Sequence, residues 1–341
     1  MAAPTSTSDR GTWNSKVGFI LAAAGSAVGL GNIWGFPTKV ATEGGGAYLL
    51  VYLICTFAIG FPVMVAELAI GRKSKKNPVG AFKALTTNKF FPLVGLWGVI
   101  CGVMILSFYT VIAGWAFGYA FEEIFYFAGW EAGAEWISNT GNGVKNAVVA
   151  SLFMVGTIKV ITGGVSEGIE RITKALMPLL IGVMVIMIGY VLFQPGASDG
   201  VREYLLPDFS KINPKLIFSA MGQAFFSLSL GMGALITYGS YLNKSENIPQ
   251  AAAFVTLADV GIAFLAGLLI IPAMYVAQAN GIDIFVGEQL ASSTTLVFQV
   301  LPALFHTMGG AVGLIFGVTF FLLLSVAALT STISLLEVPV A

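Results

Sequence analysis

Long apolar segments are the feature that most constrains this chain, because a helix needs about 20 mostly apolar residues to cross a bilayer. Eight segments meet that requirement: 17–38, 46–71, 93–127, 144–162, 172–193, 215–241, 250–277 and 309–336. None of them shows the alternation of apolar and polar residues that marks a transmembrane β-barrel. The sequence therefore predicts an all-α polytopic membrane protein.

Composition excludes several other classes of protein. Only 10% of the 341 residues are charged, whereas soluble domains carry about 25%. Lys plus Arg and Asp plus Glu both number 17, so net charge gives no argument for a nucleic-acid partner. The single histidine, His306, has no evident nucleophile to serve, which argues against an enzyme. Cys55 and Cys101 lie in apolar segments and predict neither a disulfide scaffold nor a metal site.

The distribution of Lys and Arg predicts a cytoplasmic N-terminus in a cell-membrane protein, because cytoplasmic loops are enriched in these residues. With that orientation, most of the 17 basic residues face inward: Arg10, Lys16, Arg72, Lys73, Lys75, Lys76, Lys83, Lys89, Lys159, Arg171, Lys174 and Lys244. The outward loops include 129–143, which is acidic, and 280–308, which has no Lys or Arg. We expect 280–308, with its apolar stretch 295–305, to form a folded extracellular cap; a plain surface loop is the alternative.

Two of the predicted spans carry glycines at their centres. Residues 25–37 read GSAVGLGNIWGFP, and residues 225–241 read FFSLSLGMGALITYGSY. Each interior glycine costs a helix about 1 kcal/mol, and unwound backbone is tolerated in a membrane only where it lines a cavity or is buried in protein. Paired interruptions of this kind indicate a transporter site, in which free carbonyls hold a cation and free amides hold a carboxylate. Close helix packing through glycine is the alternative, and the residues alone do not separate the two.

These motifs give the chain a resemblance to a known family. Together with EGGGAYLLVY at 43–52, AELAIGR at 66–72 and ALTSTISLLEVP at 328–339, the chain resembles the neurotransmitter:sodium symporters, most closely their bacterial amino-acid transporters. The resemblance implies an inverted-repeat fold of the bacterial leucine-transporter type, with discontinuous first and sixth helices. We expect one transporter domain over 1–341. Its first repeat would cover about 10–193, and its second, from about 214 to 341, would be incomplete after the eighth helix.

The resemblance implies two sodium sites. The first is expected to use Ala27, Asn32, Ser227 and Asp259, together with the carboxylate of the substrate. The second is expected to use Gly25, Val28, Ala327, Thr330 and Ser331. Carbonyl, amide and hydroxyl oxygens suit a hard cation. Without the resemblance, the two hydroxyls in the apolar eighth span would more simply bond back to carbonyls of their own helix.

Two deep acids refine these expectations, because acids inside a membrane are costly and usually functional. Asp259 would supply the negative charge beside sodium directly, which argues against a chloride requirement; a packing acid paired with a neighbouring helix is the alternative. Tyr52 and Gln223 would then lie behind this site. Glu67 is expected to hydrogen-bond the unwound backbone of the sixth span, with a proton-relay role as the weaker alternative.

The resemblance also places a substrate site. It implies contacts from Ala27, Leu30, Gly31, Ile105, Tyr109, Phe226, Ser229, Met232, Ser331 and Leu335. Glycine at position 29, where amine-transporting relatives place an acid, favours a substrate that brings its own carboxylate. The mostly apolar side chains favour a hydrophobic or aromatic α-amino acid, although any bundle core has similar residues.

The expected gates are only partly present. Arg10, Trp13 and Tyr241 match the cytoplasmic gate of the family, whereas Gly35 stands where relatives usually have a gate arginine. We therefore expect faster exchange of substrate from outside, and ordinary occlusion in a gate-closure measurement would overturn this. The expected function is sodium-coupled symport by alternating access, with partners limited to the amino acid, the lipid bilayer and a second copy in a homodimer. The alternative is an amino-acid-binding fragment that does not transport.

Overall fold

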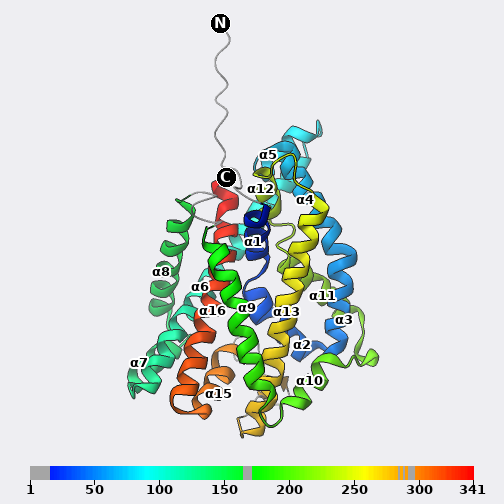
Figure 1. Ribbon diagram of the computed structural model, residues 1–341. Helices are drawn as coiled ribbons and strands as arrows, with labels where there is room; N and C mark the ends of the chain where they lie inside the picture. The colour runs from blue at the N-terminus through cyan, green and yellow to red at the C-terminus, as the bar shows by residue number, and fades with distance from the viewer. Residues whose placement is uncertain (1–15, 164–170, 283–284, 287–288, 291–295) are drawn as a thin grey trace.

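The computed structural model describes residues 16–163, 171–282, 285–286, 289–290 and 296–341. These residues form a helical bundle (Figure 1). Within them, the strands are limited to β1 (Phe285–Val286) and β2 (Gln289–Leu290), which pair antiparallel. The predicted all-α fold class is therefore confirmed.

Five helical segments of the described chain are long and apolar enough to cross a membrane, and up to seven are when each sharply bent helix pair counts as one span. The first of the five is a continuous run of α3 (Gly46–Cys55), η2 (Thr56–Gly60) and α4 (Phe61–Ser74). The other four are α6 (Phe91–Phe127), α8 (Gly143–Ile161), α13 (Ile248–Ala279) and α16 (Gly310–Val340). Each coincides with a predicted span to within a few residues.

The first predicted span is interrupted near its middle. It consists of α1 (Lys16–Ala27), a π-helical turn η1 (Gly31–Gly35) and α2 (Phe36–Glu43). The two halves meet at an angle of 45°. The second bent pair is α9 (Arg171–Leu192) with α10 (Ala197–Leu205), at 118°. That bend follows the end of a predicted span and therefore marks a turn at the bundle's edge.

The sixth predicted span, 215–241, is likewise two helices rather than one. They are α11 (Pro214–Ser227) and α12 (Ala234–Ser240), with 14 and 7 residues, separated by turns over 228–233. Neither half reaches the length of a membrane-crossing helix. Both predicted interruptions are therefore present.

The short helices lie at the two ends of the bundle. Figure 1 shows α5 (Pro78–Leu85) and α12 at the end that also holds the C-terminus, and α7 (Glu131–Ser138), α10 and α15 (Leu301–Met308) at the opposite end. The basic segment that follows α4 thus lies opposite the acidic loop near α7. The expected cap over 280–308 is helical in η5 (Leu296–Val300) and α15.

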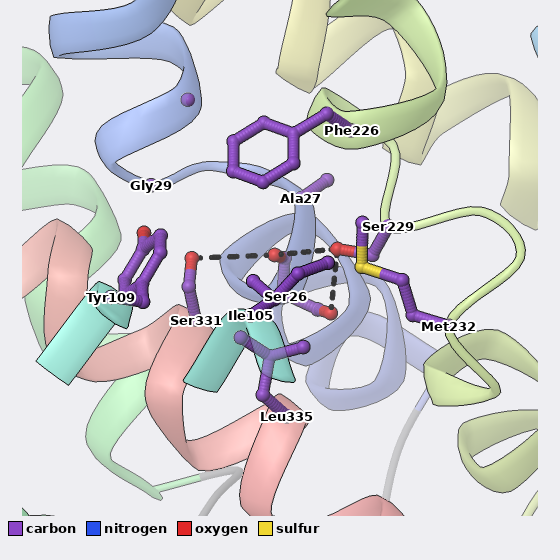
Figure 2. A pocket seen from close by; sticks show the side chains of 11 residues that line it. Ser26, Ala27, Gly29, Ile105, Tyr109, Phe226, Ser229, Met232, Ser331 and Leu335 are labelled. Carbon is purple, nitrogen blue, oxygen red and sulfur yellow. Dashed lines mark hydrogen bonds between the residues drawn. The ribbon is translucent and has the colours of Figure 1, made fainter. Parts of the chain in front are cut away.

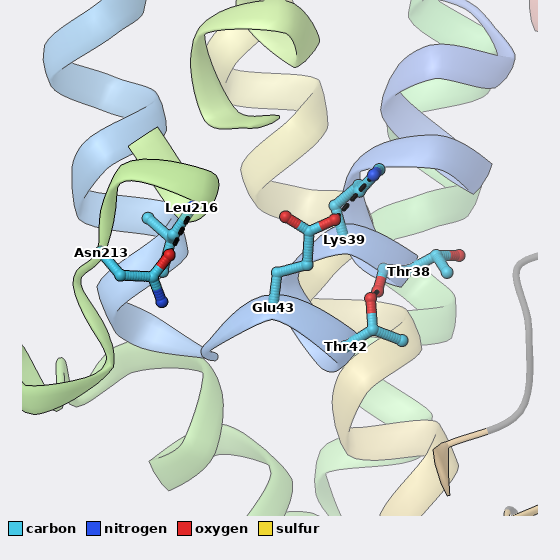
Figure 3. Close-up of polar contacts among 6 residues, drawn as sticks. All are labelled: Thr38, Lys39, Thr42, Glu43, Asn213 and Leu216. Atoms are coloured by element: carbon cyan, nitrogen blue, oxygen red, sulfur yellow. Dashed lines mark hydrogen bonds and ion pairs between the residues drawn. The ribbon is translucent and has the colours of Figure 1, made fainter. Parts of the chain in front are cut away.

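Side chains fix the starts and ends of helices next to the interruptions. Asn213, which follows the 3₁₀ turn η4 (Phe209–Lys211), accepts a hydrogen bond from the Leu216 amide at 3.0 Å and so caps α11. At the end of α2, Lys39 pairs with Glu43 at 2.7 Å, one turn along the helix. Figure 3 shows these two contacts near each other at the outer ends of α2 and α11.

Candidate functional site

The two interruptions expose backbone groups inside the bundle. Between α1 and η1, Val28 and Gly29 are not helical, and in the second interruption Gly231 and Gly233 have φ of 75° and 78°. Glycine adopts such angles without a steric cost. A Cβ atom on Gly231 would meet nothing within 4 Å, so this glycine does not serve close helix packing. The positive φ angle at the interruption, rather than close packing, therefore explains the glycine at position 231.

A small cavity lies where the two interruptions face each other, with about 20 Å³ of space for the centre of a water-sized sphere. This space holds about one water molecule, so the lining side chains must move apart to admit a ligand. Figure 2 shows the Phe226 ring and the Leu335 side chain on opposite sides of it. Its lining comes from α1, η1, α6, α11, α16 and the residues of the interruptions: Ser26, Ala27, Gly29, Gly31, Ile105, Tyr109, Phe226, Ser229, Met232, Ser331 and Leu335.

Gly29 brings the first interruption close to α6 and α16. A Cβ atom at this position would overlap the Ser331 hydroxyl and the Tyr109 hydroxyl. The Leu30 amide, the next group along the chain, donates to the Tyr109 oxygen at 2.8 Å. Any side chain at position 29 would therefore displace the groups that surround this end of the cavity.

Three serines make the cavity's polar side. The Ser229 hydroxyl donates to the Ser26 carbonyl at 3.1 Å, and the Ser331 hydroxyl donates to the same carbonyl at 3.4 Å. Figure 2 shows these oxygens as a row across the cavity. The remaining wall is mostly apolar, so the site pairs one polar edge with an apolar pocket.

Asp259 of α13 is the centre of a buried polar cluster. Its side chain is 0% exposed, and its Oδ1 atom accepts hydrogen bonds from the Asn32 amide at 2.7 Å and the Ser227 hydroxyl at 2.8 Å. The Tyr52 hydroxyl donates to Oδ2 at 3.2 Å. The Gln223 amide donates to the Gly31 carbonyl at 2.8 Å. The first interruption is thus tied to α11 and α13 by charge-assisted and neutral hydrogen bonds, and Tyr52 of α3 joins the cluster through Asp259.

A second group of oxygens lies between α1 and α16. The Thr330 hydroxyl is 2.9 Å from the Ala327 carbonyl and 3.4 Å from the Val28 carbonyl. The Ser331 hydroxyl is also 3.4 Å from the Val28 carbonyl. The hydroxyl of Thr330 therefore has both a partner in its own helix and a partner across the interruption. Gly25 is buried in α1 one turn before Val28.

Glu67 of α4 supports the second interruption. Its Oε1 atom accepts a hydrogen bond from the Gly231 amide at 2.7 Å. This is the contact that the sequence predicts for Glu67. It satisfies a backbone donor that the broken helix leaves free, which is costly to leave unpaired away from water.

Replacing Glu67 tests that support. We expect Glu67→Ala to lower the free energy of unfolding by about 1–3 kcal/mol, because it leaves the buried Gly231 amide without an acceptor. Glu67→Gln keeps a side-chain oxygen in place and should lose less than half as much. Thermal unfolding in detergent measures both. Equal losses in the two variants would contradict this role.

The sequence matches the model of a known family over almost its entire length. The sequence model of the Sodium:neurotransmitter symporter family matches residues 10–151 and 137–341. This chain belongs to that family.

Named relatives agree with this membership. An uncharacterized sodium-dependent transporter of Bacillus subtilis, YhdH, is 38% identical over 333 residues, covering 96% of this chain and 71% of the relative. A sodium-dependent neutral amino acid transporter of Homo sapiens, SLC6A17, is 30% identical over 77% of this chain and 40% of the relative. Among solved structures, MhsT in complex with L-phenylalanine is 43% identical with a TM-score of 0.87, covering 97% of this chain and 74% of MhsT. The symporter fold expected from the sequence is confirmed.

Most residues predicted for the symporter's substrate site lie together. Nine of the ten line the cavity, and Leu30 is the exception: it is fully buried, and only its amide reaches Tyr109. Asn32, Ser227 and Asp259 form one cluster. Ala27, the fourth residue expected at that sodium site, ends α1 and lines the cavity. Arg10 and Trp13 lie outside the described residues.

Two residues near the site were not predicted from the sequence. Ser26 lines the cavity, and its carbonyl accepts the two serine hydrogen bonds described above. It was missed even though its neighbours in the motif were predicted. Glu337, near the end of α16, accepts a hydrogen bond from the Tyr241 hydroxyl at 2.6 Å. A buried acid at the end of an apolar helix is the signal that would have found Glu337.

Gly35, where a gate arginine was expected, lies beside Gln223. A Cβ atom on Gly35 would be 3.6 Å from the Gln223 oxygen, which is an ordinary contact. The glutamine amide reaches the Gly31 carbonyl in the first interruption. A neutral side chain of α11, Gln223, therefore lies beside position 35, where an arginine was expected.

Proposed function

We propose that this symporter moves a hydrophobic or aromatic α-amino acid together with sodium by alternating access. The observation that carries the proposal is the small cavity at the paired interruptions, which has one polar edge and an apolar wall. Free amides near a helix start favour a carboxylate, and carbonyls at a helix end favour a cation. An α-amino acid presents both of the matching charges.

Glycine at position 29 supports an amino acid over an amine. Gly29 carries no side chain, and none of the described residues that line the cavity is an Asp or Glu that could face a substrate ammonium. The side-chain end of the cavity includes Ile105, Met232 and Leu335. Methionine adapts to ligands of different shape, including aromatic rings. The phenylalanine in the MhsT complex is of the same chemical class.

The two oxygen clusters support two sodium ions as co-substrates. Asn32, Ser227 and Asp259 would hold one, next to the substrate carboxylate, and Val28, Ala327, Thr330 and Ser331 would hold the other with Gly25. The substrate carboxylate would complete the shell of the first ion. Each ligand then raises the affinity of the other, as thermodynamic linkage requires. Asp259 provides the negative charge, so we propose that chloride is not required.

The arrangement of charge supports a cytoplasmic N-terminus. Arg72 and Lys73 lie in the last turn of α4 and begin a basic stretch. This stretch lies at the end of the bundle that holds α5 and α12. The positive-inside rule places this end in the cytoplasm of a cell-membrane protein.

Binding of L-phenylalanine to the purified full chain tests the function. We expect saturable binding in sodium that falls at least about tenfold when potassium replaces sodium, because linkage couples the two ligands. 2-Phenylethylamine, which differs only in lacking the carboxylate, should not compete. Uptake into proteoliposomes, with and without a sodium gradient, then separates transport from binding alone.

The outcomes are distinct. Equal binding in sodium and potassium would overturn sodium coupling, and competition by the amine would overturn carboxylate recognition. Sodium-dependent binding without uptake would identify an amino-acid-binding protein instead of a transporter.

A further inference from the structure

A second cluster of ionisable side chains lies far from the substrate cavity. Glu122 and Glu123 occupy the last turns of α6, and His306 is on α15. One ligand atom from each of the three residues lies within 4.8 Å of the others. Tyr109, on the same helix, is 13 residues before Glu122, which is about 20 Å along the axis. The cluster is therefore separate from the proposed sodium and substrate sites.

Two carboxylates are buried in this cluster beside a single histidine. Glu123 is 0% exposed and Glu122 is 5% exposed. Within the described part of the chain, neither pairs with a Lys or Arg. Both oxygens of Glu123, one oxygen of Glu122 and the Nε2 atom of His306 lack a hydrogen-bond partner there. Buried carboxylates are costly unless a proton or a cation neutralises them.

The spacing of the ligand atoms fits a bound cation. Nε2 of His306 lies 3.3 Å from Oε2 of Glu123, which is ion-pair distance, and this contact can balance at most one of the two carboxylates. Ligands held tetrahedrally at about 2.0–2.1 Å from Zn²⁺ are themselves roughly 3.3–3.4 Å apart. The two atoms therefore have the spacing of neighbouring ligands on one metal ion.

The surroundings hold the imidazole in this orientation. The Tyr126 ring stacks on it at 3.4 Å between centroids and 5° between planes, and the Phe127 ring meets it edge-on at 5.8 Å. On the other side, Gly317 of α16 lies against the Glu123 carboxylate, where any side chain would overlap it. A metal site needs ligand side chains that their neighbours hold in fixed positions, as these do.

We propose that Glu122, Glu123 and His306 form a binding site for a divalent transition-metal ion, with Zn²⁺ as the fitting species. One imidazole and two carboxylates are common Zn²⁺ ligands, and a water completes four-fold coordination. His306 is part-exposed at the end of the bundle that holds α7 and α15, which gives the ion a way in. The ion would fasten α15 to the end of α6.

Metal binding to the purified full chain, stripped with a chelator and carrying no histidine tag, tests this site. We expect one Zn²⁺ per chain by elemental analysis and a rise in the thermal unfolding temperature on addition of ZnCl₂. Because His306 is the chain's single histidine, X-ray absorption should show one imidazole ligand that is assignable without mutagenesis.

Variants separate this site from adventitious binding. His306→Ala and Glu123→Gln should each weaken Zn²⁺ binding at least 30-fold and abolish the thermal shift. Glu135→Gln, which changes an exposed acid on nearby α7, should leave both unchanged. Size-exclusion elution and the unfolding transition of the metal-free variants report whether they fold. If a variant does not fold, the imidazole signal of the wild-type chain decides alone.

The proposal is overturned if the wild-type chain binds no Zn²⁺ near one equivalent or if the bound ion shows no imidazole ligand. It is also overturned if folded His306→Ala and Glu123→Gln bind Zn²⁺ as the wild type does. None of these readouts depends on transport. The metal site is therefore tested independently of the proposed function.

Discussion

Asp259→Ala should abolish sodium-dependent binding of the amino acid. The change removes the carboxylate that accepts hydrogen bonds from Asn32, Ser227 and Tyr52, and with it the negative charge proposed to face sodium. Opposite charges about 4 Å apart attract by about 4 kcal/mol at an effective dielectric constant of about 20, which corresponds to roughly 1,000-fold in affinity. We expect a loss of at least about 100-fold in apparent sodium affinity, measured by phenylalanine binding over a sodium titration.

Asp259→Asn is the matched control, because it keeps the shape and one side-chain oxygen but loses the charge. We expect weaker sodium binding than in the wild type and, unlike the wild type, binding that chloride strengthens, since an added anion can then balance sodium. The Tyr52 hydroxyl donates to Asp259, and the Gln223 amide donates to Gly31, the neighbour of Asn32 in the chain. Unchanged sodium dependence in Asp259→Ala would overturn the assignment of this sodium site.

The fold follows from the sequence where length and hydropathy decide it. Predicted spans such as 93–127 and 250–277 match α6 and α13 because long apolar runs must form helices in a bilayer. Glycines at 231 and 233 predict an interruption, and both adopt positive φ there. The 118° turn between α9 and α10 was not predicted, because a change of direction at a bundle's edge leaves no periodic signal in the sequence.

The candidate site follows from the sequence mostly through the motifs. Adjacent motif residues such as Ala27 and Gly31 were expected around one cavity, and they line it. The cluster of Glu122, Glu123 and His306 could not be predicted, because Glu123 and His306 are far apart in the sequence and come together only in the folded chain. Apolar lining residues such as Ile105 could not be assigned to the cavity from the sequence alone, because the core of a helix bundle and a binding pocket use the same side chains.

Gly29→Ala should weaken amino-acid binding at least tenfold although it adds only one methyl group. The new Cβ atom would occupy the space of the Ser331 and Tyr109 hydroxyls, which border the cavity. Overpacking of this kind costs about 1–3 kcal/mol, or roughly 5- to 150-fold in affinity when the displaced groups are those that hold the ligand. We expect at least a tenfold loss in phenylalanine affinity in saturating sodium, and a larger loss for Gly29→Asp, which also adds a charge facing the substrate carboxylate.

Gly222→Ala provides the matched control for the added methyl group. Gly222 lies exposed on α11, and a Cβ atom there would meet nothing within 4 Å. This variant should bind phenylalanine as the wild type does and should unfold at the same or a slightly higher temperature, because alanine favours a helix over glycine. If Gly29→Ala also bound normally, the cavity at the interruptions would not be where the carboxylate binds, and the proposed substrate site would be wrong.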